Sequence, residues 1–425
     1  MYCGSCLRDN AMATELMSRG HDVMLLPVYT PTFTDEPNVS RDHVVLGGIS
    51  AYLEQYVPMF RKTPRWLDRI WDSKFVLSLA SRRSISTNPK MLGEMTVSVL
   101  KGEDGFQSKE IEKFIEWVKH ESPPDVINLP YSLLLGMAEP LKQALNVPIL
   151  CTLQGEDLFL DGLQDPYRAE ALRLIGKHIK HVDSFLSVSE YYARFMPGYL
   201  GIPRGKIRVV PLGINPQGFD LREQNRGGPF TIGFLARIAP EKGLHVLAEA
   251  YCILRKSGEL PEARFEAAGY MAADCKPYLE GIRKRLRAAG LEGEFHYRGV
   301  LDRADKIAFL RKLDVMSVPA TYDEPKGVSL LEAMACGVPL VQPDRGAFTE
   351  IVENTGGGLL VRPDDPESLA EGILKLVKDR HLAEELSANG FRGVREQYTA
   401  VNMADRVLEA YESVTCPTPS VPVTI

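Results

Sequence analysis

The chain has 425 residues, of which 44% are hydrophobic and 25% are charged, as in ordinary soluble globular proteins. Its formal net charge of −6 gives no reason to expect a nucleic-acid partner, so we expect a small-molecule ligand. The chain lacks an apolar run of about eighteen residues and a signal-peptide pattern at its start, which predicts a cytoplasmic protein.

The first half of the chain opens with a turn over residues 1–6 and a helix over 7–19, with no strand before them. Short apolar runs then predict strands at 23–28, 44–47, 126–129, 149–152, 185–189 and 207–211, interrupted by a helical insertion near 51–105. A doubly wound domain normally opens with a strand. We therefore expect the first strand of this domain to be missing, because the natural start lies upstream of Met1.

The second half alternates apolar runs and amphipathic stretches with greater regularity. Strands are predicted at 231–236, 264–268, 294–298, 315–318, 339–342 and 358–361, and helices at 241–256, 277–289, 303–313 and 366–378. This alternation predicts a parallel, doubly wound α/β sheet.

A Gly- and Pro-containing charged stretch, PQGFDLREQNRGGP, separates the two halves and suits an interdomain linker. We expect two Rossmann-like domains, an acceptor-binding domain over 1–217 and a nucleotide-binding domain over 218–400. A helix over 401–415 is expected to cross back to the first domain, and the Pro-rich residues 416–425 to form a disordered tail.

The segment FLARIAPEKG carries two cations at the end of a predicted strand. Arg237 follows the strand, and Lys242 opens the next predicted helix. A helix N-terminus and two cations can together neutralise a diphosphate. Taken alone, the two residues fit ordinary solvated surface cations at least as well.

Two carboxylates eight residues apart mark the loop and helix of DEPKGVSLLEAMACGVPLV. Glu324 lies in the loop after the strand 315–318, and Glu332 lies within an apolar helix over 328–338. Such loops collect ligands in open α/β sheets, and a carboxylate can accept two neighbouring sugar hydroxyls. The alternative is that Glu332 pairs with a basic residue from elsewhere in the fold.

Two glycines add weaker signals. Gly299 follows the strand in HYRGVL, where a glycine lets the backbone approach a flat ring such as a nucleobase. Gly346 in DRGAFTEIV likewise follows a predicted strand and precedes a helix, and it is the weaker signal of the two.

These motifs resemble the donor-binding domain of family 4 glycosyltransferases with the GT-B fold, in which two Rossmann-like domains face a cleft. The resemblance covers nearly the whole chain and implies a metal-independent, retaining hexosyltransferase. It implies that Arg237 and Lys242 hold the donor diphosphate, that Glu332 binds the ribose, and that Glu324 contacts the sugar. The remaining implied contacts are the backbone of Gly327 and Val328 with the sugar, the loop around Gly299 with the base, and Gly4 near the diphosphate and acceptor.

The implied substrates are a nucleoside diphosphate-hexose, with UDP, GDP or ADP as the nucleotide, and a carbohydrate or lipid-linked acceptor. No cofactor or metal is expected, and the chain contains no Asp-x-Asp triplet of the kind that holds a divalent metal in the other common glycosyltransferase fold.

The chain departs from the family pattern at Lys326, where Phe is common, and at Gln154, where His is common. The second departure bears on the identity of the donor sugar, since that His contacts it in the family, and Asp157 is a further candidate for a sugar hydroxyl.

Two other segments were weighed for function. Cys3 and Cys6 stand before a helix, where a thiol pKa falls, but we favour ordinary loop cysteines over redox or metal chemistry. The basic and aromatic residues 61–84 could contact an anionic membrane or an acceptor, although a solvated helical face is the more frequent explanation. A non-catalytic sugar-nucleotide binder and a sugar-nucleotide epimerase of the same fold stay open as alternative functions.

Overall fold

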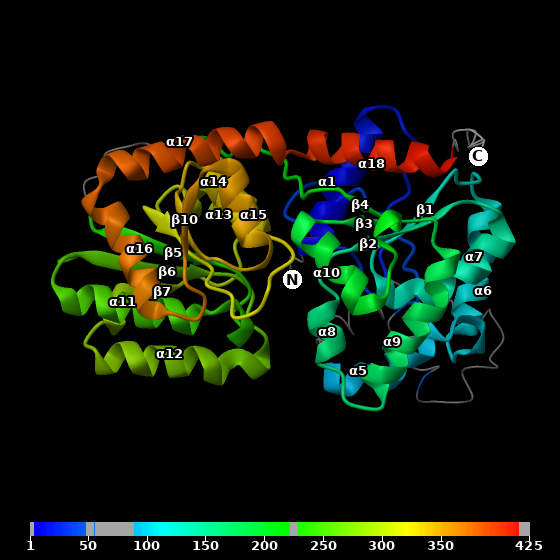
Figure 1. Ribbon diagram of the computed structural model, residues 1–425, viewed down its shortest axis with the longest axis horizontal. Coiled ribbons are helices and arrows are strands. Elements are labelled where there is room, and N and C mark those ends of the chain that lie inside the picture. Colours follow the sequence, from blue (N-terminus) through cyan, green and yellow to red (C-terminus); the bar gives the residue numbers. More distant parts are fainter. Residues whose placement is uncertain (1–3, 48–54, 56–88, 222–227, 416–425) are drawn as a thin grey trace, which may run out of the picture. The chain divides into compact units, whose positions relative to one another are not determined.

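The computed structural model describes residues 4–47, 55, 89–221 and 228–415 in two compact units (Figure 1). The first unit comprises Met1–Met12, Phe33–Pro37 and Pro211–Met403, and the second comprises Ala13–Thr32, Asn38–Val210 and Ala404–Ile425. Among the described helices, none combines the length and apolar character that a membrane span requires. Cys3, segment 61–84 and the tail 416–425 lie outside the described residues.

The first unit is built on a six-stranded parallel sheet. In chain order its strands are β5 (Phe230–Leu235), β6 (Ala263–Ala268), β7 (Phe295–Tyr297), β8 (Val315–Met316), β9 (Leu340–Pro343) and β10 (Gly358–Val361). Their order across the sheet is β10-β9-β8-β5-β6-β7. The order reverses where β8 lies beside β5, and this switch point is where doubly wound sheets bind ligands.

Helices cover both faces of this sheet, as its apolar strands require. One face carries α11 (Leu244–Ser257), α12 (Lys276–Ala288) and α16 (Pro366–Lys378) (Figure 1). The other carries α13 (Arg303–Leu310), α14 (Val328–Ala335), α15 (Gly346–Thr355) and α17 (Arg380–Gln397). Six of the eight residues of α14 are buried, which confirms the helix predicted to be apolar on every side.

The second unit holds a four-stranded parallel sheet whose strands lie in chain order. They are β1 (Ile127–Leu129), β2 (Ile149–Leu153), β3 (Ser184–Ser187) and β4 (Ile207–Val209). The helices of this unit include α5 (Pro89–Leu100), α6 (Ser108–His120), α7 (Ala138–Leu145), α8 (Asp157–Asp161), α9 (Tyr167–His178) and α10 (Glu190–Leu200). Helix α1 (Gly4–Ser18) and helix α18 (Ala400–Thr415) each have residues in both units.

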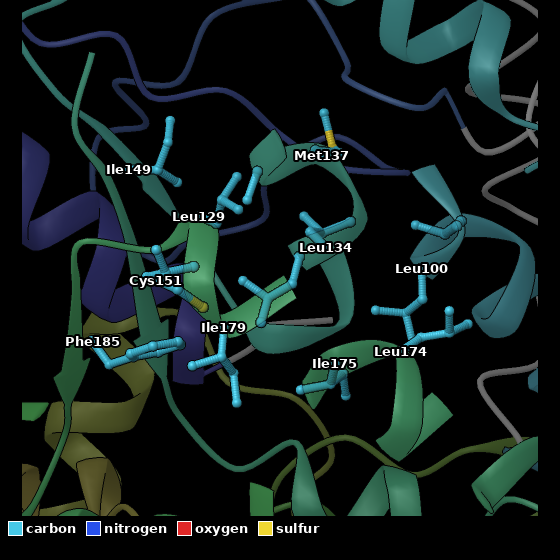
Figure 2. Packing of buried hydrophobic residues seen from close by; sticks show 14 of the residues in the cluster. Leu100, Leu129, Leu134, Met137, Ile149, Cys151, Leu174, Ile175, Ile179 and Phe185 are labelled. Carbon is cyan, nitrogen blue, oxygen red and sulfur yellow. The ribbon is translucent and has the colours of Figure 1, made fainter. Parts of the chain in front are cut away.

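The core of the second unit lies between this sheet and its helices (Figure 2). Cys151 and Phe185 from the sheet are fully buried, as are Leu100 at the end of α5 and Ile175 of α9. Each such side chain contributes about 1.5 to 3 kcal/mol on burial. The core therefore fixes the ends of α5 and α9 against the sheet.

The predicted strands at 23–28 and 44–47 are not formed as strands. A single parallel bridge joins Val28 to Val45 in the second unit. Pro27 has no N–H to donate, and the backbone of Tyr29 has a φ of 64°, so the ladder cannot extend on either side of the bridge. The other predicted strands are present with bounds that differ by a few residues.

Candidate functional site

The loops that leave β5 and β8 bring Lys242 and Glu324 together at the switch point of the first unit. Lys242 Nζ donates hydrogen bonds to Glu324 and, at 2.6 Å, to the hydroxyl of Tyr322, which also donates to Glu324. Glu324 is 7% exposed. The cluster is therefore a nearly buried ammonium and carboxylate joined by a phenol.

The backbone explains why these loops meet. Gly243 has a φ of 76°, and a Cβ at this position would overlap the carbonyl oxygen of Pro319. The N–H of Thr321 also donates to the Glu241 carbonyl at 2.9 Å. A glycine is therefore needed for the β5 loop to pack on the β8 loop.

The charge state of Glu324 follows from its surroundings. Burial favours the neutral carboxyl, but the adjacent Lys242 ammonium and the Tyr322 hydroxyl outweigh it and hold the pKa of Glu324 below its usual range. The carboxylate is therefore ionised at neutral pH, and it forms an ion pair with Lys242.

Arg237 does not join this cluster. Its guanidinium pairs with Glu241, four residues further along the loop that leaves β5, and its side chain is 41% exposed. Lys242 also differs from its prediction, because it ends a short 3-10 turn, η6 (Pro240–Lys242), and α11 begins only at Leu244. The prediction that Lys242 opens a helix was wrong, since the left-handed Gly243 separates the turn from the helix.

Glu332 has a protein partner. Lys306 Nζ, from α13, lies 2.5 Å from Glu332 Oε1 and 2.5 Å from Asp35 Oδ2. Burial raises the pKa of Glu332, and Lys306 opposes that rise. Glu332 thus pairs with a basic residue from elsewhere in the fold, as the alternative interpretation of the sequence predicts, and the ribose contact stays a prediction.

A pocket of the first unit lies beside Glu332. It is lined, among others, by Arg8, Asp35, Glu36, Arg303, Val328 and Glu332. Arg8 is 2% exposed, and its Nε and Nη2 have no hydrogen-bond partner among the described residues. Its Nη1 donates to Asp9 at 2.6 Å. A buried guanidinium with unused N–H groups can donate hydrogen bonds to an anionic or carbonyl group of a ligand.

Arg8 and Lys306 were not singled out from the sequence. The one available signal for Arg8 was its place in the first turn of the helix predicted over residues 7–19, after the predicted turn over 1–6. Lys306 carried no such signal, because a lysine within an amphipathic helix is ordinarily a solvated residue.

Gly4 and the start of α14 are brought together in the first unit. A Cβ on Gly4 would stand 3.7 Å from Val328 Cγ2, and Lys326 Nζ donates to the hydroxyl of Ser5 at 2.9 Å. Gly327 and Val328 begin α14, where backbone N–H groups lack helical acceptors. The residue that replaces the family's usual Phe thus binds the start of α1, next to Gly4, which is helical rather than in the predicted turn.

Gly299 lies apart from the switch point within the sheet. It follows β7, which is the edge strand and is separated from β5 by β6. Its backbone has a φ of 74°, and a Cβ there would meet nothing within 4 Å. The backbone is therefore accessible there, as a stacking role requires, but the contact with the base remains a prediction.

Gln154 belongs to the second unit and follows β2. It is buried, and its Nε2 donates to the carbonyl of Pro130 at 2.8 Å. Asp157 accepts a 2.7 Å hydrogen bond from Tyr192, and burial raises the pKa of Asp157. Their roles toward a sugar stay predictions.

Two parallel α/β sheets in one chain, one of them doubly wound with an ion pair at its switch point, are typical of a class of α/β proteins that bind ligands at that point. Residues 219–392 match the family model described as glycosyl transferases group 1, and residues 102–217 match that of glycosyltransferase family 4. The chain belongs to the family 4 glycosyltransferases, and the predicted GT-B fold is confirmed.

Relatives with known names agree with this assignment. A glycosyltransferase of Methanocaldococcus jannaschii is 28% identical over 239 residues, which are 53% of this chain and 59% of that protein. The chain thus spans less than two thirds of that relative. The phosphatidyl-myo-inositol mannosyltransferase of Mycobacterium tuberculosis is 28% identical over 318 residues, 71% of this chain and 77% of its own.

Solved structures share the fold at lower identity. Sucrose-phosphate synthase from Thermosynechococcus elongatus has a TM-score of 0.69 at 18% identity, and covers 96% of this chain and 92% of that chain. HepE of Anabaena, solved in complex with UDP-glucose, has a TM-score of 0.63 at 16% identity, over 92% of this chain and 100% of that chain.

Proposed function

We propose that the protein transfers a hexose from a nucleoside diphosphate-hexose to an acceptor hydroxyl, with retention of anomeric configuration and without a metal ion. The observation that carries the proposal is the ion pair of Lys242 and Glu324 at the switch point of the first unit. This is where an open α/β sheet collects its ligand.

Lys242 supplies the charge that the reaction needs. The nucleoside diphosphate leaves as an anion, and an ammonium aimed at its phosphate stabilises that charge in the transition state. Only 17% of the Lys242 side chain is exposed, so water screens its charge little. A donor phosphate would replace Glu324 as the counter-ion of Lys242.

Glu324 is then released toward the sugar. The Tyr322 hydroxyl still donates to Glu324, and an ionised carboxylate can accept hydrogen bonds from sugar hydroxyls. Glu324 lies in the loop that precedes α14, and the first N–H groups of that helix can donate to the same sugar. Arg237 would help to neutralise the diphosphate only if its guanidinium left Glu241 and bound a phosphate instead.

The nature of the donor draws support from two sources. HepE was solved with UDP-glucose, and the M. tuberculosis relative is named a mannosyltransferase, which favours a nucleotide-hexose for this chain as well. Retention follows from the family resemblance, in which the donor phosphate oxygen accepts the proton of the acceptor.

The test is incubation of the full chain with UDP-, GDP- and ADP-hexoses and a panel of sugar and lipid-linked acceptors. Transfer, hydrolysis and isomerisation of the donor are scored separately, and NMR of the product reads the anomeric configuration. Isomerisation without transfer would indicate an epimerase, and donor binding without either reaction would indicate a sugar-nucleotide binder. An inverted product would reject retention, and loss of transfer after chelator treatment would reject metal independence.

A further inference from the structure

A glutamate and two histidines that the proposed reaction does not use converge in the second unit. They are Glu139 near the start of α7, His178 at the last position of α9, and His181 at the end of the 3-10 turn η4 (Ile179–His181). One ligand atom from each lies within 4.8 Å of the other two. The turn η4 runs directly into β3, so His181 stands at the amino end of that strand, opposite the end where such sheets bind substrates.

The local backbone explains why the two histidines share a face. The α-helix tightens into a 3-10 turn between them, and side chains three residues apart eclipse each other in such a turn. Their ring centroids are 6.2 Å apart. The spacing His-x-x-His is thereby converted into a pair of neighbouring imidazoles.

His178 is held in one tautomer. Its Nε2 lies 2.9 Å from the carbonyl oxygen of Leu100, the last residue of α5. A carbonyl only accepts, so Nε2 carries the proton and Nδ1 carries a lone pair. His178 is 3% exposed, and Nδ1 has no hydrogen-bond partner among the described residues. A buried lone pair without a donor is an unusual cost that a metal ion would remove.

His181 and Glu139 present the other two ligand atoms. His181 Nε2 lies 3.4 Å from Glu139 Oε2, yet within the described part of the chain it makes no hydrogen bond.

We propose that Glu139, His178 through Nδ1 and His181 bind one Zn²⁺ ion, which joins α7 to the junction of α9 and η4. Two imidazoles and a carboxylate form a recognised three-residue zinc set, with a water as the fourth ligand. Ligands about 2.0 to 2.2 Å from one ion stand at most about 4.4 Å apart. The side chains of Glu139 and His181, 35% and 17% exposed, therefore close in slightly when the ion enters.

The ligand atoms favour zinc over hard cations. Lys142, Lys177 and Lys180 lie near His181, and Lys142 is paired with Asp183 at 2.6 Å. Mg²⁺ and Ca²⁺ need several oxygen ligands, which one carboxylate cannot supply beside three lysines. Zn²⁺ binds imidazole nitrogen strongly enough to tolerate them.

The test measures Zn²⁺ binding by the chelator-stripped full chain with calorimetry and thermal unfolding. We expect one Zn²⁺ per chain at this site and a rise in Tm with Zn²⁺ but not with Mg²⁺. His181→Ala and Glu139→Gln should each weaken Zn²⁺ binding by at least about tenfold. Both changes leave the bond between His178 and Leu100 intact, so the fold is kept.

His120→Ala and Cys6→Ser serve as matched controls, since they remove a histidine and a thiol from elsewhere in the chain. They should keep the wild-type affinity. Unchanged Zn²⁺ affinity in both site variants, loss of affinity in a control instead, an equal Mg²⁺ response, or absence of saturable Zn²⁺ binding would each overturn the proposal. Because no donor or acceptor is present, the result is independent of sugar transfer.

Discussion

Lys306 of α13 neutralises Glu332 of α14 inside the first unit, with 2.5 Å between Nζ and Oε1. Both side chains are less than a tenth exposed. The pair explains how a carboxylate is tolerated in an apolar helix, and it means that a ribose would have to share or displace the ammonium.

Removing one member of this pair should destabilise the protein. Lys306→Met leaves Glu332 buried with its main cationic partner gone, and we expect a loss of about 3 to 5 kcal/mol in the free energy of unfolding, measured with urea. Adding Glu332→Leu to Lys306→Met should recover part of that loss, because the buried Asp35 still lacks the Lys306 ammonium. A single variant as stable as wild type would show that the ion pair is not structural.

Lys242 is expected to govern turnover. Lys242→Ala should lower kcat by about 100- to 1000-fold while the far-UV circular dichroism is kept, because the lost ammonium acts mainly on the leaving diphosphate. Lys256→Ala, at the end of α11, is the matched control and should leave kcat unchanged. Equal turnover in the two variants would remove Lys242 from the chemistry.

Gly243 should be nearly irreplaceable. Gly243→Ala adds a Cβ that overlaps the Pro319 carbonyl at a φ of 76°, so the β5 and β8 loops must separate. Gly258→Ala provides the control, because Gly258 has a φ of 74° but open space around its Cβ. The control should cost about 1 kcal/mol, and Gly243→Ala several times more, together with a loss of donor binding.

Arg8 should separate stability from binding. Arg8→Met removes buried donors that lack partners among the described residues, so the free protein should be at least as stable as wild type. If the pocket binds a phosphorylated ligand, the same variant should weaken nucleoside diphosphate binding, read by thermal shift. Unfolding of the variant, or unchanged nucleotide affinity, would contradict this account of Arg8.

Glu294 should make stability depend on pH. Its carboxylate receives a two-point hydrogen bond from Arg255 at 2.7 and 2.8 Å, and this lowers the pKa of Glu294 below 4.5. Because the pKa of Glu294 is lower in the folded than in the unfolded protein, the ionised pair stabilises the fold above pH 4.5. This stabilisation is lost as the pH falls through the folded-state pKa. Glu294→Gln should cost about 1 to 2 kcal/mol at pH 7 and flatten the pH dependence below 4.5. A variant whose pH profile matches wild type would exclude this pair as the source.

The sheet of the first unit was predictable because its strands are continuous apolar runs separated by amphipathic helices. Residues 358–361 match β10 at both ends. The apolar pattern alone could not show that residues 23–28 and 44–47 do not form strands, since the positive φ of Tyr29 is imposed by the surrounding structure. Alternation identifies a candidate strand, but a ladder needs neighbours with donors in register.

The site was predictable to the extent that its residues lie on adjacent loops. Glu324 and Lys242 were identified because each follows a strand, and parallel strands bring such loops to one edge. Lys306, the partner of Glu332, was not identified from the sequence. It lies on another helix, 26 residues away, and no local pattern reveals how that helix packs. Arg237 pairs with Glu241, which lies only four residues along the same loop, and this local pairing was not anticipated.

Tyr322 is hydrogen-bonded to both Lys242 and Glu324, and this arrangement affects how the phosphate of a donor would bind to Lys242. The ammonium is already stripped of most water and aimed by a rigid phenol, so an arriving phosphate exchanges one anion for another. Little solvent has to reorganise during that exchange, and the affinity for the donor should depend only weakly on ionic strength.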